Sequence, residues 1–348
     1  MAERARPTIY DVARRAHVSH GTVSRVINDR PHVSPATRAL VHTAMSELGF
    51  VRNHTAYRLK SPGSVRQRIG VIVEQLHEVG ASGNTLAALA ELQSAGYGVD
   101  LATVNGEDVA ASVTQALAQF DGSTCGVLAL AQSEEMRRVL LGRTVPVPVY
   151  IDRFLDRGTP DQPGAEELIG RVAAEHLSAL GHQRVLHLPG PAGALAAGHR
   201  RDAFVARAGA LDMVVDIGPE GDWTSASGYE LAGSIRPHIH TAVFVANDAM
   251  AIGLMHGLRG RSIGVPDQVS VLGVDDAPEA QHLDPQLTSV RHDLSAEGRL
   301  AAHILIHTIQ GRPEPDPTEY LRVSVSARTS TAPPGPARRR SVIDISTE

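Results

Sequence analysis

Residues 10–28 read YDVARRAHVSHGTVSRVIN, the pattern of two short helices joined by a tight turn. Thr8 is placed to cap the first helix. The apolar residues of that helix recur at helical spacing and are Ile9, Val12, Ala13 and Ala16. Residues 17–19 (HVS) interrupt the spacing, and Ser19 can cap a second helix over 20–28. Two helices separated by a three-residue turn are typical of a DNA-binding helix-turn-helix.

A third helix follows this pair. Ser34 is placed as its N-cap, Pro35 at its first position and Gly49 just past its end. Its apolar side chains are Leu40, Val41, Ala44, Met45 and Leu48. The sequence therefore predicts an all-α headpiece over about residues 1–50.

The charge of the chain is divided unevenly. The formal net charge of −5 over 348 residues combines +8 in residues 1–68 with −13 in the remainder. A basic N-terminal segment on an acidic body favours a polyanionic partner for that segment. On charge alone, a solvated basic tail is an equally good interpretation. Lys60 is the only lysine among the 33 lysine and arginine residues.

The start of the second helix supplies the candidate contacts to bases. In a helix-turn-helix, this part of the second helix reaches base edges in the major groove, and it carries His20, Gly21, Ser24 and Arg25. Arg25 suits guanine O6 and N7, a contact worth about 1–3 kcal/mol of discrimination. Hydroxyl and amide donors suited to phosphates are Thr8, Tyr10, Ser19, Thr22 and Asn28. The alternative is a small helical bundle with arginines on its surface.

From Ile69 the chain alternates between strand-like and helix-like segments. This alternation predicts βαβ units with parallel sheets, and its length favours two lobes over one. The predicted strands are 69–73, 97–104, 126–130, 147–151, 184–188, 213–217, 242–245, 269–273 and 321–327. The predicted helices are 84–95, 107–119, 133–141, 167–180, 199–209, 225–236 and 248–259.

Polar residues follow several of these strands, where ligands of open α/β sheets bind. They are Asp152, Asn247, Asp248, Asp275 and Asp276, with Arg200 and Arg201 opening a helix and the only tryptophan, Trp223, in a loop. Carboxylates, an amide, an arginine and one flat aromatic face suit the hydroxyls and C–H face of a sugar. Taken singly, each aspartate is also a good helix N-cap and the tryptophan a good buried anchor.

The quoted stretch resembles the headpiece of the LacI family of bacterial repressors, together with HVSPATR (32–38), MSELGF (45–50) and NHTAYRL (53–59). The resemblance implies a hinge helix over 53–59 that folds on operator DNA. It places Leu59 as an apolar wedge in the central minor-groove step, with Ala56 as its close-packed neighbour. The further DNA contacts that we expect are His32, Ser34, Thr37, Asn53, Tyr57 and Lys60.

Four positions of the headpiece and hinge depart from the family pattern. His17 stands where a glycine is common, and a positive φ would strain it. Gly21 offers no side chain at a main base-reading position. Arg52 replaces a frequent proline before the hinge, and Tyr57 a common polar residue within it. These departures concern the operator sequence and not the mode of binding.

The resemblance continues through the body, and the matching segments include IGVIV (69–73), YIDR (150–153), RRDAF (200–204), GDWTSASGY (221–229), VANDAMAIG (245–253) and PQLTSVRHD (285–293). It implies an α/β core of two Rossmann-like lobes, similar to periplasmic sugar-binding proteins, with an effector in the cleft. The implied effector contacts are Asp152, Arg200, Trp223, Asn247, Asp275 and His292. His292 replaces a frequent glutamine at the crossover between lobes. The GDW tripeptide is most similar to members that respond to galactosides and other plant-derived disaccharides.

The domains that we expect are a headpiece (1–50), a hinge and linker (51–68), a core (69–334) and a disordered tail (335–348). Lobe 1 would comprise about 69–164 and 294–322, and lobe 2 about 165–293 and 323–334. The expected protein is a cytoplasmic, nucleoid-associated homodimer that binds a pseudo-palindromic operator and is switched by a small sugar or related polyol.

Other classes of protein find little support. One cysteine, Cys125, excludes a disulfide framework and a cysteine-based metal cluster. No phosphate-binding GxxxxGK or nucleophile GxSxG motif occurs. His303 and His307 have metal-ligand spacing on a helix but lack the glutamate of HExxH and an evident third ligand. We therefore expect no catalytic residues, cofactor or metal, and no membrane partner. The rival functions are a sugar-binding receptor and an α/β enzyme.

Overall fold

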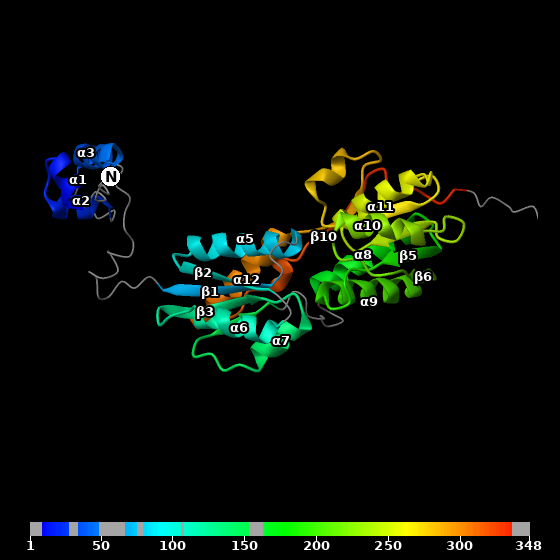
Figure 1. The fold of residues 1–348 in the computed structure, drawn as a ribbon, viewed down its shortest axis with the longest axis horizontal. Helices are drawn as coiled ribbons and strands as arrows, with labels where there is room; N and C mark the ends of the chain where they lie inside the picture. The colour runs from blue at the N-terminus through cyan, green and yellow to red at the C-terminus, as the bar shows by residue number, and fades with distance from the viewer. Residues whose placement is uncertain are drawn as a thin grey trace, which may run out of the picture. The chain divides into compact units, whose positions relative to one another are not determined.

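The computed structural model describes residues 9–27, 34–48, 67–74, 79–105, 108–152 and 163–335. It divides into two compact units, Met1–Val65 and Arg66–Glu348 (Figure 1). No helix in the described part of the chain has the length and apolar character needed to cross a bilayer.

The described residues of the first unit form three helices, α1 (Ile9–Arg15), α2 (His20–Ile27) and α3 (Pro35–Leu48). Their shared core comprises Val12, Ala13, Ala16, Val23, Val26, Val41 and Ala44. These are residues of the apolar faces that the sequence pattern predicts. Ser19 caps α2 by accepting the backbone N–H of Thr22 at 3.0 Å, and Ser34 accepts that of Thr37 at 3.1 Å. His17 in the turn has φ 51°, the left-handed conformation that glycine adopts more easily.

Lobe 1 of the second unit is built on a four-stranded parallel sheet in the order β2-β1-β3-β4. The strands are β1 (Arg68–Glu74), β2 (Gly98–Val104), β3 (Thr124–Leu130) and β4 (Val149–Ile151). Its helices are α5 (Val79–Ser94), α6 (Val109–Ala118), α7 (Glu134–Leu141) and α12 (Leu294–Ile309). α5 and α12 contribute to the core on one face of the sheet, and α6 and α7 to the core on the other.

Lobe 2 has a six-stranded sheet in the order β10-β9-β8-β7-β5-β6. The strands are β5 (Arg184–Leu188), β6 (Val214–Ile217), β7 (Ala242–Val245), β8 (Ser270–Val274), β9 (Thr288–His292) and β10 (Val323–Ser326). Only β10, at the edge, runs antiparallel to its neighbour. The helices are α8 (Ala165–Ala179), α9 (Leu195–Ala210), α10 (Ser225–Leu231) and α11 (Asp248–Gly260), with short 3₁₀ turns at Ala232–Ser234, Pro278–His282 and Pro317–Glu319. α8 and α9 cover one face, and α10 and α11 the other.

The chain crosses between the lobes from β9 into α12 of lobe 1 and back into β10. Three helix boundaries differ from the prediction by four residues or more: the starts of α5 and α9 and the end of α10, with α9 beginning at Leu195 instead of 199. α5 begins at Val79 although Gly80 and Gly83 disfavour a helix, because Gly83 lets α5 approach α12: a Cβ there would lie 3.0 Å from Leu294. α10 ends at Leu231 and continues only as a 3₁₀ turn.

Candidate functional site

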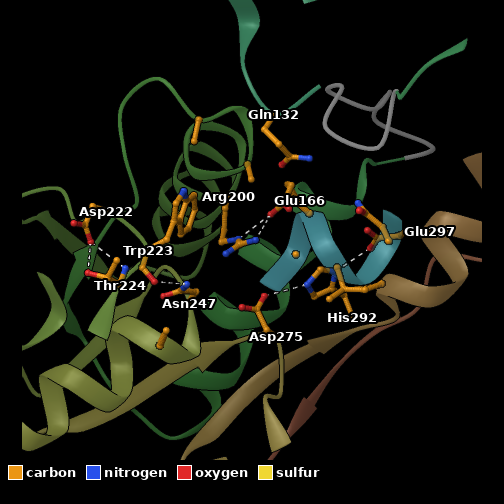
Figure 2. Close-up of a pocket in the computed structure, with 17 residues that line it drawn as sticks. Gln132, Glu166, Arg200, Asp222, Trp223, Thr224, Asn247, Asp275, His292 and Glu297 are labelled. Carbon is orange, nitrogen blue, oxygen red and sulfur yellow. Dashed lines mark hydrogen bonds and ion pairs between the residues drawn. The ribbon is translucent and has the colours of Figure 1, made fainter. Parts of the chain in front are cut away.

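A cavity of about 260 Å³ lies between the two lobes at the carboxyl ends of the lobe 2 strands (Figure 2). Lobe 1 lines it with Gly80, Ala81, Asn84, Gln132, Leu294 and Glu297. Lobe 2 contributes Glu166, Ala194, Ala196, Arg200, Asp222, Trp223, Thr224, Asn247, Ala249, Asp275 and His292. Five of the six predicted effector residues therefore meet in one place, although they come from separate loops and strands.

Arg200 on α9 is held in place before any ligand binds. Only 4% of its side chain is exposed, and its guanidinium lies 2.6 Å from a carboxylate oxygen of Glu166 on α8. It also donates to the backbone carbonyl of Ala246, at the end of β7. Its central carbon lies 6.0 Å from the centre of the Trp223 ring. The guanidinium of Arg200 is thus fixed by Glu166 and by the carbonyl of Ala246, and the indole of Trp223 lies against one of its faces.

Trp223 occupies a strained loop between β6 and α10. Its φ is 69°, a conformation that aromatic residues rarely adopt. Gly190 makes room for the ring, because a Cβ there would lie 2.5 Å from the indole. The indole Nε1 is buried and has no hydrogen-bond partner. Backbone strain and an unsatisfied donor cluster at functional sites, where the surrounding structure holds them in place.

Asn247 positions this loop. Its Oδ1 caps α11 by accepting the backbone N–H of Met250 at 2.9 Å, and its Nδ2 donates to the carbonyl of Trp223 at 3.0 Å. The residue therefore ties the tryptophan loop to the start of α11.

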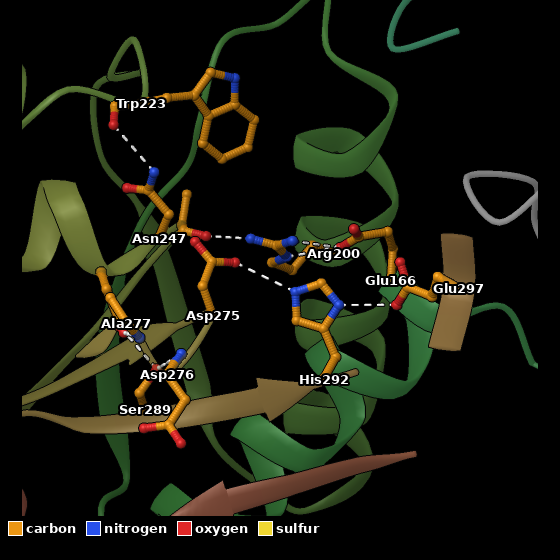
Figure 3. Close-up of polar contacts among 12 residues, drawn as sticks. Glu166, Arg200, Trp223, Asn247, Asp275, Asp276, Ala277, Ser289, His292 and Glu297 are labelled. Atoms are coloured by element: carbon orange, nitrogen blue, oxygen red, sulfur yellow. Dashed lines mark hydrogen bonds and ion pairs between the residues drawn. The ribbon is translucent and has the colours of Figure 1, made fainter. Parts of the chain in front are cut away.

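His292 joins the two lobes through two carboxylates (Figure 3). Its Nδ1 lies 2.9 Å from Glu297 on α12, and its Nε2 lies 3.3 Å from Asp275 after β8. Since carboxylate oxygens only accept hydrogen bonds, both ring nitrogens donate and the imidazole carries a positive charge. Burial alone lowers the pKa of His292, but the charge of Glu297 and the hydrogen bond to Asp275 outweigh it and raise the pKa to about 10.

Two other aspartates at the strand ends have structural partners. Asp248 accepts hydrogen bonds from Ser289 Oγ at 2.7 Å and from the backbone N–H of Ala277 at 2.8 Å. Burial, reinforced by the charge of Asp275, raises the pKa of Asp248 to about 8. Asp276 pairs with Arg328 at 2.5 Å. Both hold the β8 loop in shape, and neither lines the cavity.

Asp152 also lies outside the cavity lining. It is 1% exposed at the end of β4, where its backbone N–H donates to Ala129 at 2.8 Å and its carbonyl accepts from Arg137 at 3.2 Å. Its role as an effector contact stays a prediction.

The sequence prediction omitted six polar residues of the cavity, which are Asn84, Gln132, Glu166, Asp222, Thr224 and Glu297. Glu166 and Glu297 lie in the first turns of α8 and α12, where acidic residues are common because they suit the helix dipole. No sequence signal separates these two carboxylates from ordinary ones.

The histidines with metal-ligand spacing have other partners. His303 contacts Tyr320 Oη at 2.8 Å and Glu91 at 3.0 Å, and His307 contacts the carbonyl of Pro313 at 2.5 Å. Within the described ranges, no cluster of three histidine, cysteine, aspartate or glutamate residues could hold a metal ion.

The helical unit presents α2 as a candidate nucleic-acid interface. Arg25 and His20 are exposed on it, and Gly21 and Thr22 are partly buried. Ser19 and Thr22 share a hydrogen bond at 2.9 Å across the start of the helix. Tyr10 and Ser24 lie within α1 and α2, and Ser34 and Thr37 at the start of α3. Outside the described residues fall Thr8, Asn28, His32, Asn53, Ala56, Tyr57, Leu59 and Lys60.

Comparison with known proteins gives a consistent result for both units. The family of bacterial regulatory proteins named lacI matches residues 8–53, and a periplasmic binding protein-like domain matches 174–331. The transcriptional regulator CelR of Thermobifida fusca is 31% identical over 337 residues, which cover 93% of this chain and 96% of CelR. The Lac repressor bound to ONPG in its repressed state superposes with a TM-score of 0.72 at 29% identity, covering 94% of this chain and 100% of that one. A CelR–cellobiose complex gives a TM-score of 0.63 at 29% identity and covers 93% and 100% of the two chains.

Proposed function

Because the chain belongs to the LacI family and is a DNA-binding transcriptional regulator, we propose that it is a homodimeric repressor of carbohydrate-utilisation genes. A small sugar or related polyol, bound in the cavity between the lobes, controls its hold on DNA. The protein acts at the nucleoid, in the cytoplasm. The matched helix-turn-helix argues against a receptor that binds sugar alone.

DNA binding follows from the first unit. Two headpieces, each over 1–50, place α2 in successive major grooves of a pseudo-palindromic operator, which a two-fold symmetric dimer matches. Arg25 reads guanine from the exposed side of α2. The hinge helix over 53–59, which lies outside the described residues, carries the minor-groove wedge at Leu59.

The observation that carries the sugar assignment is the composition of the cavity. A tryptophan face, a fixed arginine, an amide and a carboxylate converge on about 260 Å³ of space. Both cations of the lining are already paired, Arg200 with Glu166 and His292 with Asp275 and Glu297, while the fourth carboxylate, Asp222, accepts hydrogen bonds from Thr224. Because both cations are neutralised by carboxylates of the protein itself and the lining holds more carboxylates than cations, the cavity disfavours an anionic ligand. It suits a ligand with many hydroxyls, which can add hydrogen bonds without bringing a negative charge.

Control of DNA binding follows from the place of that cavity. A ligand that contacts both lobes changes the angle between them, and so separates the two hinges of the dimer. Since the hinge helices fold only on DNA, the free-energy cost of ordering them opposes binding. A change of about 3 kcal/mol in the free energy of DNA binding alters the affinity for the operator by about two orders of magnitude.

Gel shift with the DNA upstream of the gene tests the proposal. We expect a specific complex at moderate salt, and its absence with the full chain would count against a repressor. Arg25→Ala should bind DNA without sequence preference, and Leu59→Ala should bind more weakly and bend it less. Trp223→Ala should bind DNA like wild type and lose the response to sugar.

A further inference from the structure

The lobe 1 wall of the cavity contains a polar atom that the protein itself leaves unsatisfied. Asn84 on α5 is 7% exposed, lines the cavity, and its Oδ1 has no hydrogen-bond partner. Its neighbour Thr85, also buried, donates to the carbonyl of Ala81 within the same helix at 2.5 Å. The helix thus satisfies one buried polar side chain and leaves the oxygen of the adjacent one, a residue of the cavity wall, buried without a partner.

The backbone of Asn84 is held tightly. Gly298 on α12 lets the two helices touch, because a Cβ there would lie 2.0 Å from the carbonyl oxygen of Asn84. α5 therefore cannot rotate to expose the amide to water without separating from α12. The oxygen Oδ1 of Asn84 is therefore buried without a hydrogen bond, which costs free energy. A ligand that brings a hydrogen-bond donor to it would remove that cost.

The rest of this wall shows what kind of donor fits. Gly80 and Ala81 are small and leave space, and the side chain of Gln132 also points into the cavity (Figure 2). The aromatic face and the fixed cation both lie on the opposite wall, at Trp223 and Arg200. If one sugar ring lies against Trp223, the substituent on that ring faces the lobe 1 wall with its two carboxamides, Asn84 and Gln132.

We propose that Asn84 determines effector specificity by accepting a hydroxyl group from the part of the ligand that lies against lobe 1. The effector is then a disaccharide, with hydroxyls on both rings, in preference to a single sugar carrying an apolar aglycone. This inference rests on the proposed sugar effector. An aglycone without a donor leaves Oδ1 buried and unsatisfied, at a cost of about 10- to 100-fold in affinity.

The test compares matched ligands on the full-length chain. Cellobiose, maltose and lactose are titrated beside p-nitrophenyl β-glucoside, p-nitrophenyl α-glucoside and o-nitrophenyl β-galactoside, with Kd measured from the fluorescence of Trp223. The variants are Asn84→Leu and a control, Gln115→Leu, which also replaces a carboxamide side chain by leucine but at an exposed position of α6. The thermal midpoint of each ligand-free protein is recorded first.

We expect at least one disaccharide to bind wild type 10-fold or more tightly than its nitrophenyl partner. Asn84→Leu should remove or reverse that ratio, and Gln115→Leu should keep it. Ligand-free Asn84→Leu should melt no lower than wild type, because it loses an unsatisfied acceptor. A ratio unchanged in Asn84→Leu, a preference of wild type for nitrophenyl glycosides, or a lower midpoint of the ligand-free variant would overturn the inference while leaving a sugar effector in place. No binding of any of the six sugars to wild type would instead contradict the proposed function.

Discussion

Two ion pairs join the same helices of lobe 2 and differ in burial, which allows a controlled test of what fixes Arg200. Glu166 and Arg200 are 2.6 Å apart, with side chains 8% and 4% exposed. Glu175 and Arg207 are 2.8 Å apart, with side chains 48% and 39% exposed. Both pairs link α8 to α9, so the same two elements are tested in both cases.

Glu166→Ala leaves a buried guanidinium whose remaining partner is the carbonyl of Ala246. Removing one member of a buried pair costs about 3–5 kcal/mol, because the other charge stays desolvated. Glu175→Ala removes a pair that water screens, and we expect a loss of about 0–1 kcal/mol. Urea unfolding followed by circular dichroism measures both free energies. Equal losses for the two variants would refute the reasoning that burial makes the Arg200 pair structurally critical.

Three further variants test the cavity and its surroundings. The pKa of His292 is about 10 in the folded protein against an ordinary 6.5, so the stability that its charge contributes is complete below pH 6.5 and is lost toward pH 10. The excess stability of wild type over His292→Gln should therefore fall by about 1.4 kcal/mol per pH unit across that range. A difference that stays constant with pH in urea titrations would contradict this. Gly190→Ala forces the Trp223 ring away, so the emission of the only tryptophan should shift and sugar affinity fall about 10-fold; an unchanged spectrum would show that the close contact is not rigid. The pKa of Asp248 is about 8 against an ordinary 3.8, so the folded state favours the protonated acid and wild type loses stability as pH rises from 4 to 8. The stability of Asp248→Asn relative to wild type should therefore rise by a few kcal/mol over that range. A variant that is less stable than wild type at pH 8 would be evidence that the acid is ionised.

Local pattern sufficed for most of the fold and for part of the site. The helices around Val12, Val23 and Val41 follow from apolar spacing, and the alternation from Ile69 onward follows from buried parallel strands. Asn247 and Asp275 could be placed together because the carboxyl ends of parallel strands share one edge of a sheet.

The remaining parts of the site depend on tertiary contacts that no local pattern encodes. Glu297 reaches His292 only because the chain crosses between lobes between them. Asn84 reaches the cavity because α5 packs on α12 at Gly298. Trp223 was identifiable as the only tryptophan, but its left-handed backbone follows from how its loop is held by Asn247.

The measurement that tests the central claim most directly is fluorescence anisotropy of labelled upstream DNA, titrated with the full-length protein. It is made with and without the sugar that raises the thermal midpoint most, and at two salt concentrations. The account predicts specific binding that weakens at higher salt, as phosphate contacts require, and that the sugar lowers at least 10-fold at each salt concentration. Equal binding to unrelated DNA, or a specific complex whose affinity is the same with and without a sugar that binds, would contradict it.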